Sequence, residues 1–264
     1  MKTRARASDG YRLTLPEAPF LLAADLDGTL VGDDEGEQAL AAIGRSSRGS
    51  CYLAVVTGRG LSSVQRLVTE GRLPPPDFVA SSVGTELLAC GDSTNALGRK
   101  YAARAPRRWS LESIYALGQG DGIRRQAFPG GQPPFHAGFD WDGRMGTLTA
   151  LRRRLVAGLE FECRIVDSFG RYVDVVPPQL GKGELVRFLQ TELGIDHERV
   201  VVAGDSGNDR GMFETGFKGI VPINALDELK AVASQPCHYH SPYPAARGVI
   251  DGLCHFGFLA PTCA

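Results

Sequence analysis

Short apolar runs, each ending in glycine or in acidic and polar residues, recur along the first and last thirds of the chain. Nearly every position in these runs is apolar, which is typical of strands buried on both faces of a parallel sheet. Between the runs, apolar residues recur at helical spacing. We therefore expect strands at residues 20–24, 51–56, 78–80, 200–203 and 218–223, and helices at residues 37–43, 61–68, 184–193, 225–233 and 245–256. This alternation predicts an α/β fold with a Rossmann-like parallel-sheet core.

The pattern changes between about residue 98 and residue 178. Two segments with helical spacing are combined there with three strand-like segments, which suggests an α+β module with its own small core. The helices are expected at residues 107–117 and 146–159, and the strands at residues 134–141, 161–166 and 172–176. Pro177 and Pro178 form a stiff boundary behind the module. We therefore expect a lead-in of residues 1–19, a core of residues 20–97 and 179–264, and an inserted α+β cap of residues 98–178.

Composition narrows the class of function. The chain has 264 residues with 29 basic and 30 acidic side chains, so its net charge of −1 gives no electrostatic reason to expect nucleic acid or an acidic membrane as a partner. No apolar run is long enough to span a membrane. The six cysteines are scattered and show no Cys-x-x-Cys spacing, which fits reduced thiols and predicts a cytoplasmic protein.

Acidic residues gather at the ends of two predicted strands. Asp25 and Asp27 follow the first strand, and Asp205 and Asp209 lie in the stretch Gly-Asp-Ser-Gly-Asn-Asp after a later one. Strand ends of a parallel sheet meet at one edge, where ligands bind in open α/β folds. Acids so close together are costly unless a cation or hydrogen-bond donors compensate them. Carboxylates and carbonyls are ligands that Mg²⁺ prefers, so we expect these four residues, Asp27 through its carbonyl, to hold Mg²⁺.

The same sheet edge carries the other groups that phosphoryl transfer needs, which are a nucleophile, phosphate-binding donors and a proton shuttle. Asp25 is placed to act as the nucleophile through an aspartyl-phosphate, and Asp27 to protonate the leaving oxygen and then activate water. Thr57, in a glycine-containing turn, and Lys182, at a helix start, are expected to hold the phosphoryl oxygens. The simpler alternative is that Asp25 and Asp27 only end a strand and begin a turn.

Four stretches together resemble the motifs of the haloacid-dehalogenase-like phosphatases. They are Asp25-Leu-Asp27-Gly-Thr, Thr57-Gly58-Arg59, Lys182, and the stretch from Gly204 to Asp209, which includes Asn208. All four occur in the expected order, and the second acid of the first stretch excludes the dehalogenase branch. The resemblance implies an inserted cap over the site and adds Gly58, Arg59 and Asn208 as candidate contacts to the substrate phosphate.

Within this superfamily the chain resembles the sucrose-phosphate phosphatases over nearly its whole length from Phe20. Further matching stretches are residues 83–86, 169–177, 204–214 and 255–259. The resemblance implies a Mg²⁺-dependent phosphatase acting on sucrose 6-phosphate, with a sucrose-phosphate synthase-type enzyme as a partner. It also implies that the cap recognises the sugar, with the candidates His136, Asp140, Ser168, Arg171 and Asp174. One departure is that His136 stands where a lysine is usual, so mannosylfructose phosphate and other glycosyl phosphates stay open as substrates.

Two alternatives belong to other functional classes. A signalling receiver module also combines an acidic pair, a phospho-accepting aspartate, a hydroxyl and a lysine. The long insertion between Thr57 and Lys182 does not fit such a compact module, and Asp27 is placed to hydrolyse a phospho-aspartate quickly. A non-catalytic partner of a sucrose-synthesising enzyme could keep the fold, but the intact acids argue against that as its sole role.

Overall fold

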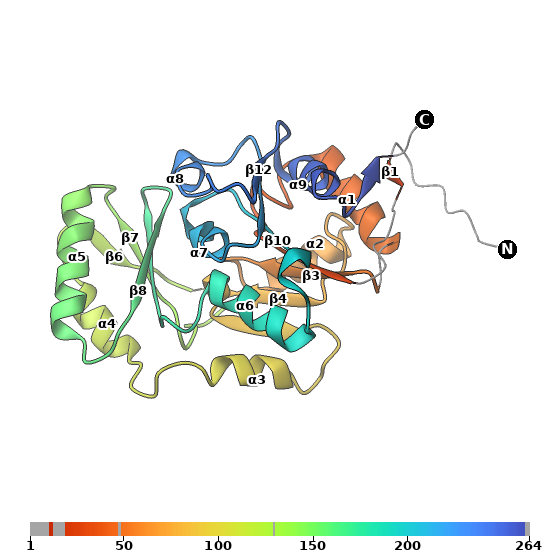
Figure 1. The fold of residues 1–264 in the computed structure, drawn as a ribbon. Helices are drawn as coiled ribbons and strands as arrows, with labels where there is room; N and C mark the ends of the chain where they lie inside the picture. Colours follow the sequence, from red (N-terminus) through yellow and green to blue (C-terminus); the bar gives the residue numbers. More distant parts are fainter. Residues whose placement is uncertain (1–10, 13–18, 47–48, 129, 262–264) are drawn as a thin grey trace.

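The computed structural model describes residues 11–12, 19–46, 49–128 and 130–261, and two sheets organise most of this chain (Figure 1). The larger sheet has seven strands in the order β12-β11-β10-β2-β3-β4-β5, all parallel except β5. In chain order its strands are β2 (Phe20–Ala24), β3 (Cys51–Val56), β4 (Phe78–Ser81), β5 (Glu86–Ala89), β10 (Val200–Ala203), β11 (Lys218–Val221) and β12 (His238–His240). The expected α/β fold with a mainly parallel sheet is confirmed.

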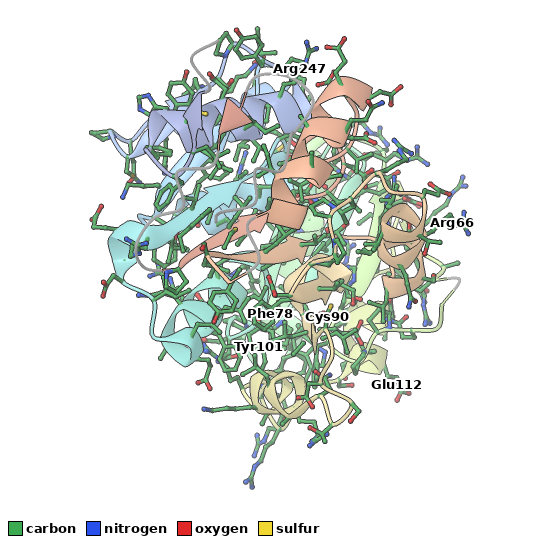
Figure 2. All side chains as sticks on the ribbon, turned by 90° about the vertical axis from the view of Figure 1, so that its right-hand side faces the viewer. Arg66, Phe78, Cys90, Tyr101, Glu112 and Arg247 are labelled. Carbon is green, nitrogen blue, oxygen red and sulfur yellow. The ribbon has the colours of Figure 1, made fainter. Side chains whose placement is uncertain are left out.

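Helices cover both faces of this sheet because its strands are apolar on both sides. In β2, Leu21 and Ala23 pack into one core cluster and Phe20 and Leu22 into another. The first cluster includes side chains of α3 (Ala96–Ala102), α6 (Lys182–Leu193), α7 (Arg210–Phe213) and α8 (Asp227–Lys230). The second includes side chains of α1 (Asp34–Ser46), α2 (Leu61–Thr69) and α9 (Ala245–His255). Figure 2 shows the two sides, with Phe78 and Tyr101 near α3 and Arg247 on α9.

The second sheet has four antiparallel strands in the order β6-β7-β9-β8. They are β6 (Ile123–Arg125), β7 (Ala137–Trp141), β8 (Arg164–Ser168) and β9 (Tyr172–Val176), with α4 (Leu111–Gly118) and α5 (Met145–Gly158) packed on one face. Alternate residues of β7, including Phe139 and Trp141, point into this separate small core. Figure 1 shows α4 and α5 on the outer side of this sheet, so its other face is turned toward the seven-stranded sheet.

Several element boundaries differ from expectation. Helix α4 begins at Leu111 and not near residue 107, because the Ser110 hydroxyl accepts a hydrogen bond from Ser113 N at 3.2 Å and caps the helix there. Helix α1 starts at Asp34, and α8 is shorter than the predicted segment of residues 225–233. Residues 81–86 hold the short helix η1 (Ser82–Gly84) and lead into the antiparallel strand β5. Helix α3 and strands β6 and β12 have no counterpart in the predicted elements.

The proposed division between core and cap cuts through α3. This helix spans the expected boundary between residues 97 and 98, and its Tyr101 belongs to the core cluster with Phe188 of α6. We therefore propose that the cap begins after α3. In the expected lead-in, β1 (Tyr11–Arg12) pairs with β13 (Ala260–Pro261), while residues 1–10 and 13–18 lie outside the described chain. Among the described helices, none combines the length and apolarity needed to cross a membrane.

Candidate functional site

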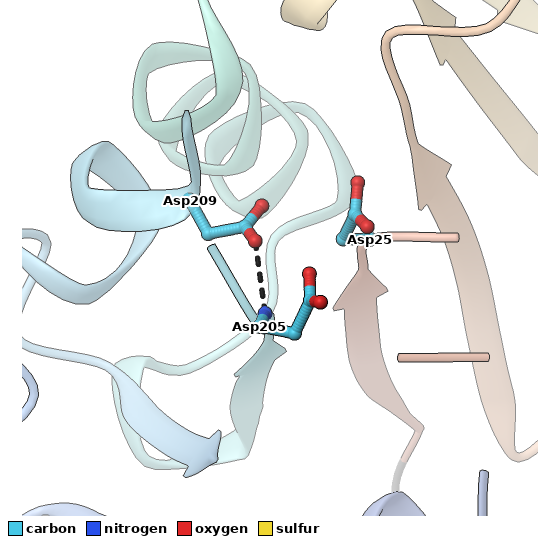
Figure 3. A group of neighbouring side chains, drawn as sticks. All are labelled: Asp25, Asp205 and Asp209. Carbon is cyan, nitrogen blue, oxygen red and sulfur yellow. Dashed lines mark hydrogen bonds between the residues drawn. The ribbon is translucent and has the colours of Figure 1, made fainter. Parts of the chain in front are cut away.

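Three neighbouring strands of the parallel sheet end in the residues singled out from the sequence. Strand β2 lies between β10 and β3, and its Ala24 is in register with Ala203 and Val55. Asp25 therefore emerges beside Asp205, which follows β10, and close to the turn that Thr57 opens after β3. Figure 3 shows Asp25 and Asp205 just beyond the tips of these adjacent strands, with Asp209 on the short helix that follows. The sheet edge thus brings residues from both ends of the chain into one site.

A compact acidic cluster forms the floor of this site. Asp25, Asp205 and Asp209 are buried, and each contributes one carboxylate oxygen to a group whose members lie within 4.8 Å of one another. Lys182, also buried, donates hydrogen bonds to Asp25 Oδ1 at 2.6 Å, Asp209 Oδ1 at 2.7 Å and Asn208 Oδ1 at 2.9 Å. One ammonium group therefore faces three carboxyl groups, which leaves the cluster short of positive charge.

The pKa values reflect that shortage. Burial, followed by the nearby Asp209 and Asp25 carboxylates, raises the pKa of Asp205 to about 8. Burial also raises the pKa of Asp25 to about 7, although the Lys182 ammonium partly offsets this. Burial alone would lower the pKa of Lys182, but the Asp209 and Asp25 carboxylates raise it above its ordinary value. The lysine thus keeps its charge, and a further cation would relieve the two raised carboxyl groups.

The donor set fits a hard divalent cation. Asp205 Oδ1 is buried without a hydrogen-bond partner among the described residues, although such atoms are normally paired. Gly28 lies so close that a Cβ on it would sit 2.2 Å from Asp205 Oδ2, so only glycine leaves this carboxylate in place. Clustered carboxylate oxygens with an open side suit Mg²⁺ better than softer metals. Asp25, Asp205 and Asp209 are therefore the residues that could hold such an ion.

The loop that carries two of these acids is held by its own hydrogen bonds. Asp209 Oδ2 accepts from the backbone N–H groups of Asp205, at 3.0 Å, and Ser206, at 3.1 Å. With the Ser206 side chain this forms a capping box at η3 (Gly207–Asp209). One oxygen of Asp209 thus shapes the loop while the other binds Lys182. Asp209 therefore fixes both the acidic loop and the lysine.

The position of Lys182 depends on the backbone segment that precedes it and on the turn packed against that segment. The preceding Gly181 has φ +117° and donates its N–H to Gly84 O at 3.2 Å. The fully buried Tyr101 hydroxyl donates to Gly84 O at 2.9 Å and accepts from Gly181 N at 3.1 Å. Ser82, Val83 and Gly84 all have positive φ, so this turn stores strain that its neighbours must hold. Tyr101 thus joins the strained turn to the start of α6.

Asp27 and Thr57 lie at the rim and the wall of the site. Arg59 binds the Asp27 carboxylate with two hydrogen bonds, one from Nε at 2.7 Å and one from Nη2, and both side chains are about half exposed. The buried Thr57 hydroxyl oxygen accepts from Arg59 N at 3.0 Å. Arg59 therefore has a defined partner, which the sequence alone did not indicate. The Asp27 side chain is separate from the acidic cluster, which consists of the other three predicted metal ligands.

A cavity of about 370 Å³ lies between this floor and the cap sheet. Nine of the predicted residues line it, namely Asp25, Asp27, Thr57, Gly58, Arg59, His136, Ser168, Asp174 and Asn208. Residues that were not predicted also line it, namely Val83, Gln126, Phe128, Phe169, Tyr172 and Ser206. The signal that could have found Tyr172 is strand alternation, because Tyr172 and Asp174 share one face of β9. Gln126 and Phe128 both follow the edge strand β6, which has no clear sequence pattern.

The cap contributes a buried polar pair to this cavity. His136 Nε2 lies 2.7 Å from Asp174 Oδ1, and both side chains are buried. His136 Nδ1 is buried and has no hydrogen-bond partner in the described chain. The ring of Phe128 packs edge-on against the imidazole at 5.0 Å. A buried nitrogen without a partner beside a cavity is a group that a ligand hydroxyl can satisfy.

Two predicted cap residues do not line the cavity. Asp140 shares the inner face of β7 but accepts a hydrogen bond from Gln126 Nε2 at 3.3 Å. Arg171 is exposed in the turn between β8 and β9, with its guanidinium 5.1 Å from the ring centre of Tyr172. Strand alternation places Asp140 on the face of β7 that is turned toward the core, but farther along the strand than the cavity lining. Arg171 lies in the turn and therefore outside the sheet.

Comparisons with known proteins find relatives that match most of the chain. A family model described as sucrose-6F-phosphate phosphohydrolase matches residues 18–257. A mannosylfructose-phosphate phosphatase from Agrobacterium fabrum is 31% identical over 247 residues, covering 90% of this chain and 96% of that protein. A glucosylglycerol-phosphate synthase from Pseudomonas anguilliseptica is 30% identical over 242 residues, which cover 91% of this chain but only 31% of the synthase.

A solved structure gives the same result for the fold. The sucrose-phosphatase from Synechocystis sp. PCC6803, in complex with sucrose and phosphate, superposes with a TM-score of 0.81 at 27% identity. The match covers 91% of this chain and 98% of that one, so it includes both the core and the cap. The family model and the first relative each span most of the chain. The protein therefore belongs to the sucrose-6F-phosphate phosphohydrolase family of haloacid-dehalogenase-like phosphatases, which are phosphoric monoester hydrolases.

Proposed function

We propose that the protein is a Mg²⁺-dependent sugar-phosphate phosphatase that works through an aspartyl-phosphate on Asp25, with sucrose 6-phosphate as its substrate. One observation carries the proposal. The buried Asp25 carboxylate, bound by Lys182 and flanked by Asp205 and Asp209, forms the floor of a cavity whose other wall is the cap sheet. A nucleophile, a cation site and a sugar-sized space thus meet at one point.

The first chemical step forms the phospho-enzyme. An Asp25 carboxylate oxygen attacks phosphorus, the bond from phosphorus to the sugar oxygen breaks, and that oxygen takes a proton from Asp27. Thr57 and Lys182 hold the phosphoryl oxygens, and Asn208 orients the ammonium group through its 2.9 Å hydrogen bond. Bound Mg²⁺, held by Asp25, Asp205 and Asp209, would neutralise negative charge on the phosphoryl group.

The second step returns the enzyme to its starting state. Asp27 takes a proton from water, the water oxygen attacks phosphorus, and the bond to Asp25 breaks to release inorganic phosphate. Asp27 must serve both leaving group and water, which fits its place at the exposed rim of the cavity. Arg59 holds the Asp27 carboxyl group at this rim before the substrate binds.

The cap supports a sugar as the part that leaves. Phe128, Phe169 and Tyr172 give the cavity aromatic surface, while His136, Asp174 and Gln126 supply hydrogen-bonding groups. Sugar rings combine apolar faces with hydroxyls, so they suit such a wall. The named relatives support sucrose phosphate and mannosylfructose phosphate about equally, and the synthase relative adds glucosylglycerol phosphate to the candidates. The match covers only 31% of the synthase relative, so a segment similar to this chain lies there within a longer synthase, which supports a sucrose-phosphate synthase-type partner as part of the proposal. The scattered cysteines support a cytoplasmic location as a further part of the proposal.

The experiment that tests this function is phosphate release from a substrate panel with Mg²⁺ and with a chelator. The panel contains sucrose 6-phosphate, mannosylfructose phosphate, glucosylglycerol phosphate, trehalose 6-phosphate and simple hexose phosphates. Metal-dependent turnover that favours sucrose 6-phosphate supports the full proposal. Preference for another glycosyl phosphate keeps the chemistry and replaces the substrate. No release from any member contradicts the proposal and favours a receiver or a non-catalytic partner.

A further inference from the structure

A second cavity reaches the reaction centre from the other side of Lys182. It has a volume of about 310 Å³ and lies between cap strand β8 and the starts of α6 and α7. It shares Val83 and Asn208 with the cavity of about 370 Å³ under the cap, which we name the substrate cavity. Lys182 lines the second cavity. Because Lys182 Nζ is 2.6 Å from Asp25 Oδ1, the lysine and Asn208 stand between the nucleophile and this second space, which we name the rear cavity.

Guanidinium groups distinguish the rear cavity from the substrate cavity. Arg152 of α5, Arg164 of β8 and Arg210 of α7 line it, against the two carboxylates of Asp167 and Glu214. Among the described residues, Arg59 is the one arginine that lines the substrate cavity, and the Asp27 carboxylate accepts hydrogen bonds from its side chain. The rear cavity therefore carries the features of an anion site, and the substrate cavity those of a sugar site.

Much of the hydrogen-bonding capacity of these arginines remains open. A guanidinium has five N–H donors. Arg152 gives one to Asp167 Oδ1 at 2.9 Å, and Arg164 gives one to the carbonyl of Pro178 at 2.8 Å and lies 3.7 Å from Glu184. Arg210 donates to the backbone carbonyl of Glu228 at 3.3 Å and has no carboxylate partner in the described chain. Forked donors of this kind match the oxygens of phosphate.

The two products of the proposed reaction differ in the same way as the two cavities. The sugar is neutral, and the substrate cavity offers it aromatic surface and hydrogen-bonding groups. Inorganic phosphate is a small anion that is released beside Lys182 and Asn208, of which Asn208 lines both cavities and Lys182 the rear one. An anion that passes this wall meets the arginine side chains instead of the three buried carboxylates behind it.

We propose that the rear cavity is a binding site for inorganic phosphate, through which the product leaves the reaction centre while the cap still covers the sugar side. This inference rests on the proposed function, since hydrolysis is what supplies the phosphate there. The site consists of Arg152, Arg164 and Arg210, with Lys182 and Asn208 at its inner end. Phosphate bound there leaves the substrate cavity free, so it inhibits without competing with substrate.

The kinetic test measures inhibition by inorganic phosphate at several substrate concentrations. The expected inhibition is mixed, with one component at the reaction centre that competes with substrate and one at the rear cavity that does not. Arg152→Gln and Arg210→Gln are each expected to weaken the second component by about tenfold, the loss of roughly one charge-assisted hydrogen bond, and to leave the first unchanged. Arg153→Gln is the matched control, because Arg153 neighbours Arg152 on α5, is exposed and does not line the cavity.

A binding experiment separates this site from the proposed function. Inorganic phosphate is titrated calorimetrically into the full chain in the presence of chelator, where the carboxylates repel an anion from the reaction centre. One phosphate site is expected, which Arg152→Gln and Arg210→Gln weaken and Arg153→Gln does not. Purely competitive inhibition, or phosphate binding unchanged by both variants, overturns the rear site. If the two arginine variants weaken phosphate binding but the protein hydrolyses none of the sugar phosphates, the rear site is retained and the phosphatase proposal is rejected.

Discussion

Replacing Asp25 with asparagine is expected to stabilise the metal-free protein while it abolishes turnover. The carboxyl group is buried, and burial raises its pKa from 3.8 to about 7 in spite of the contact with Lys182. An amide of the same shape keeps an oxygen for the Lys182 hydrogen bond but carries no charge. The variant therefore removes an electrostatic cost of folding together with the nucleophile.

The size of the effect follows from proton linkage. A carboxyl group whose pKa is higher in the folded than in the unfolded state binds its proton more tightly when folded, so stability falls as the pH rises from about 3.8 toward 7. At 1.36 kcal/mol per pKa unit, the shifted pKa of Asp25 costs at most about 4 kcal/mol above this range, where the group is ionised in both states. Near pH 5, where folding requires the carboxylate to take up a proton, the cost is about 1 to 2 kcal/mol. Asp25→Asn is expected to recover that amount, with the larger gain at alkaline pH.

The assay is urea unfolding in chelator at about pH 5 and about pH 8.5, on either side of the raised pKa. Asp27→Asn is the matched control, because Asp27 is half exposed and paired with Arg59, and losing such a surface pair costs about 0 to 1 kcal/mol. Added Mg²⁺ should reverse the order of stability, since the wild-type cluster binds it more tightly than the Asp25→Asn cluster. A gain in stability that is the same at both pH values would refute the electrostatic argument, and retained phosphatase activity would refute the role as nucleophile.

Three further substitutions test how the site is held. Gly28→Ala places a Cβ 2.2 Å from an Asp205 oxygen, at a residue whose φ is +74°. We therefore expect the free energy of unfolding to fall by at least about 1 to 2 kcal/mol and Mg²⁺ to bind more weakly in calorimetry. An unchanged Mg²⁺ affinity would contradict the metal assignment. Tyr101→Phe removes the hydroxyl that binds Gly84 O and Gly181 N next to Lys182. This should lower the free energy of unfolding by about 1 to 3 kcal/mol and lower kcat more than it raises KM. A loss in stability alone would limit Tyr101 to a structural role. The Glu228 carboxylate accepts hydrogen bonds from Phe169 N on the cap at 3.2 Å and from Gly207 N on the core at 2.8 Å. Glu228→Ala removes both, so KM should rise several-fold because the cap closes less firmly. An unchanged KM would show that this contact does not help to close the cap.

The sequence was most informative where burial leaves a simple pattern. Strands β2, β3 and β10 are apolar along their length because helices cover both faces, and the predicted bounds of all three agree with the structure. Strands β6 and β12, in contrast, lie at sheet edges and contain arginine or histidine, so they lack this pattern. Helix α3 is short, and its buried contacts are with distant segments.

The chemistry of the floor was also predictable from the chain, because strand-end residues of a parallel sheet are brought to one edge by the topology itself. That argument groups Asp25, Thr57 and Asp205 without knowledge of any side-chain contact. It does not say which acid binds which base. The pairing of Asp27 with Arg59, and the separation of Asp27 from the other three acids, follow from side-chain directions that only the folded chain sets.

The sequence by itself thus determined the fold class, the order of the motifs and the acidic floor, since these depend on burial periodicity and strand direction. Only the tertiary structure decided which cap residues face the floor, how Tyr101 supports Gly181, the residue before Lys182, across 80 residues, and that a second, arginine-lined cavity exists. The physical reason is that these features arise where distant segments pack together, as the cap does against the core and α3 against α6. Contacts between surfaces far apart in the chain leave no periodic trace in either segment.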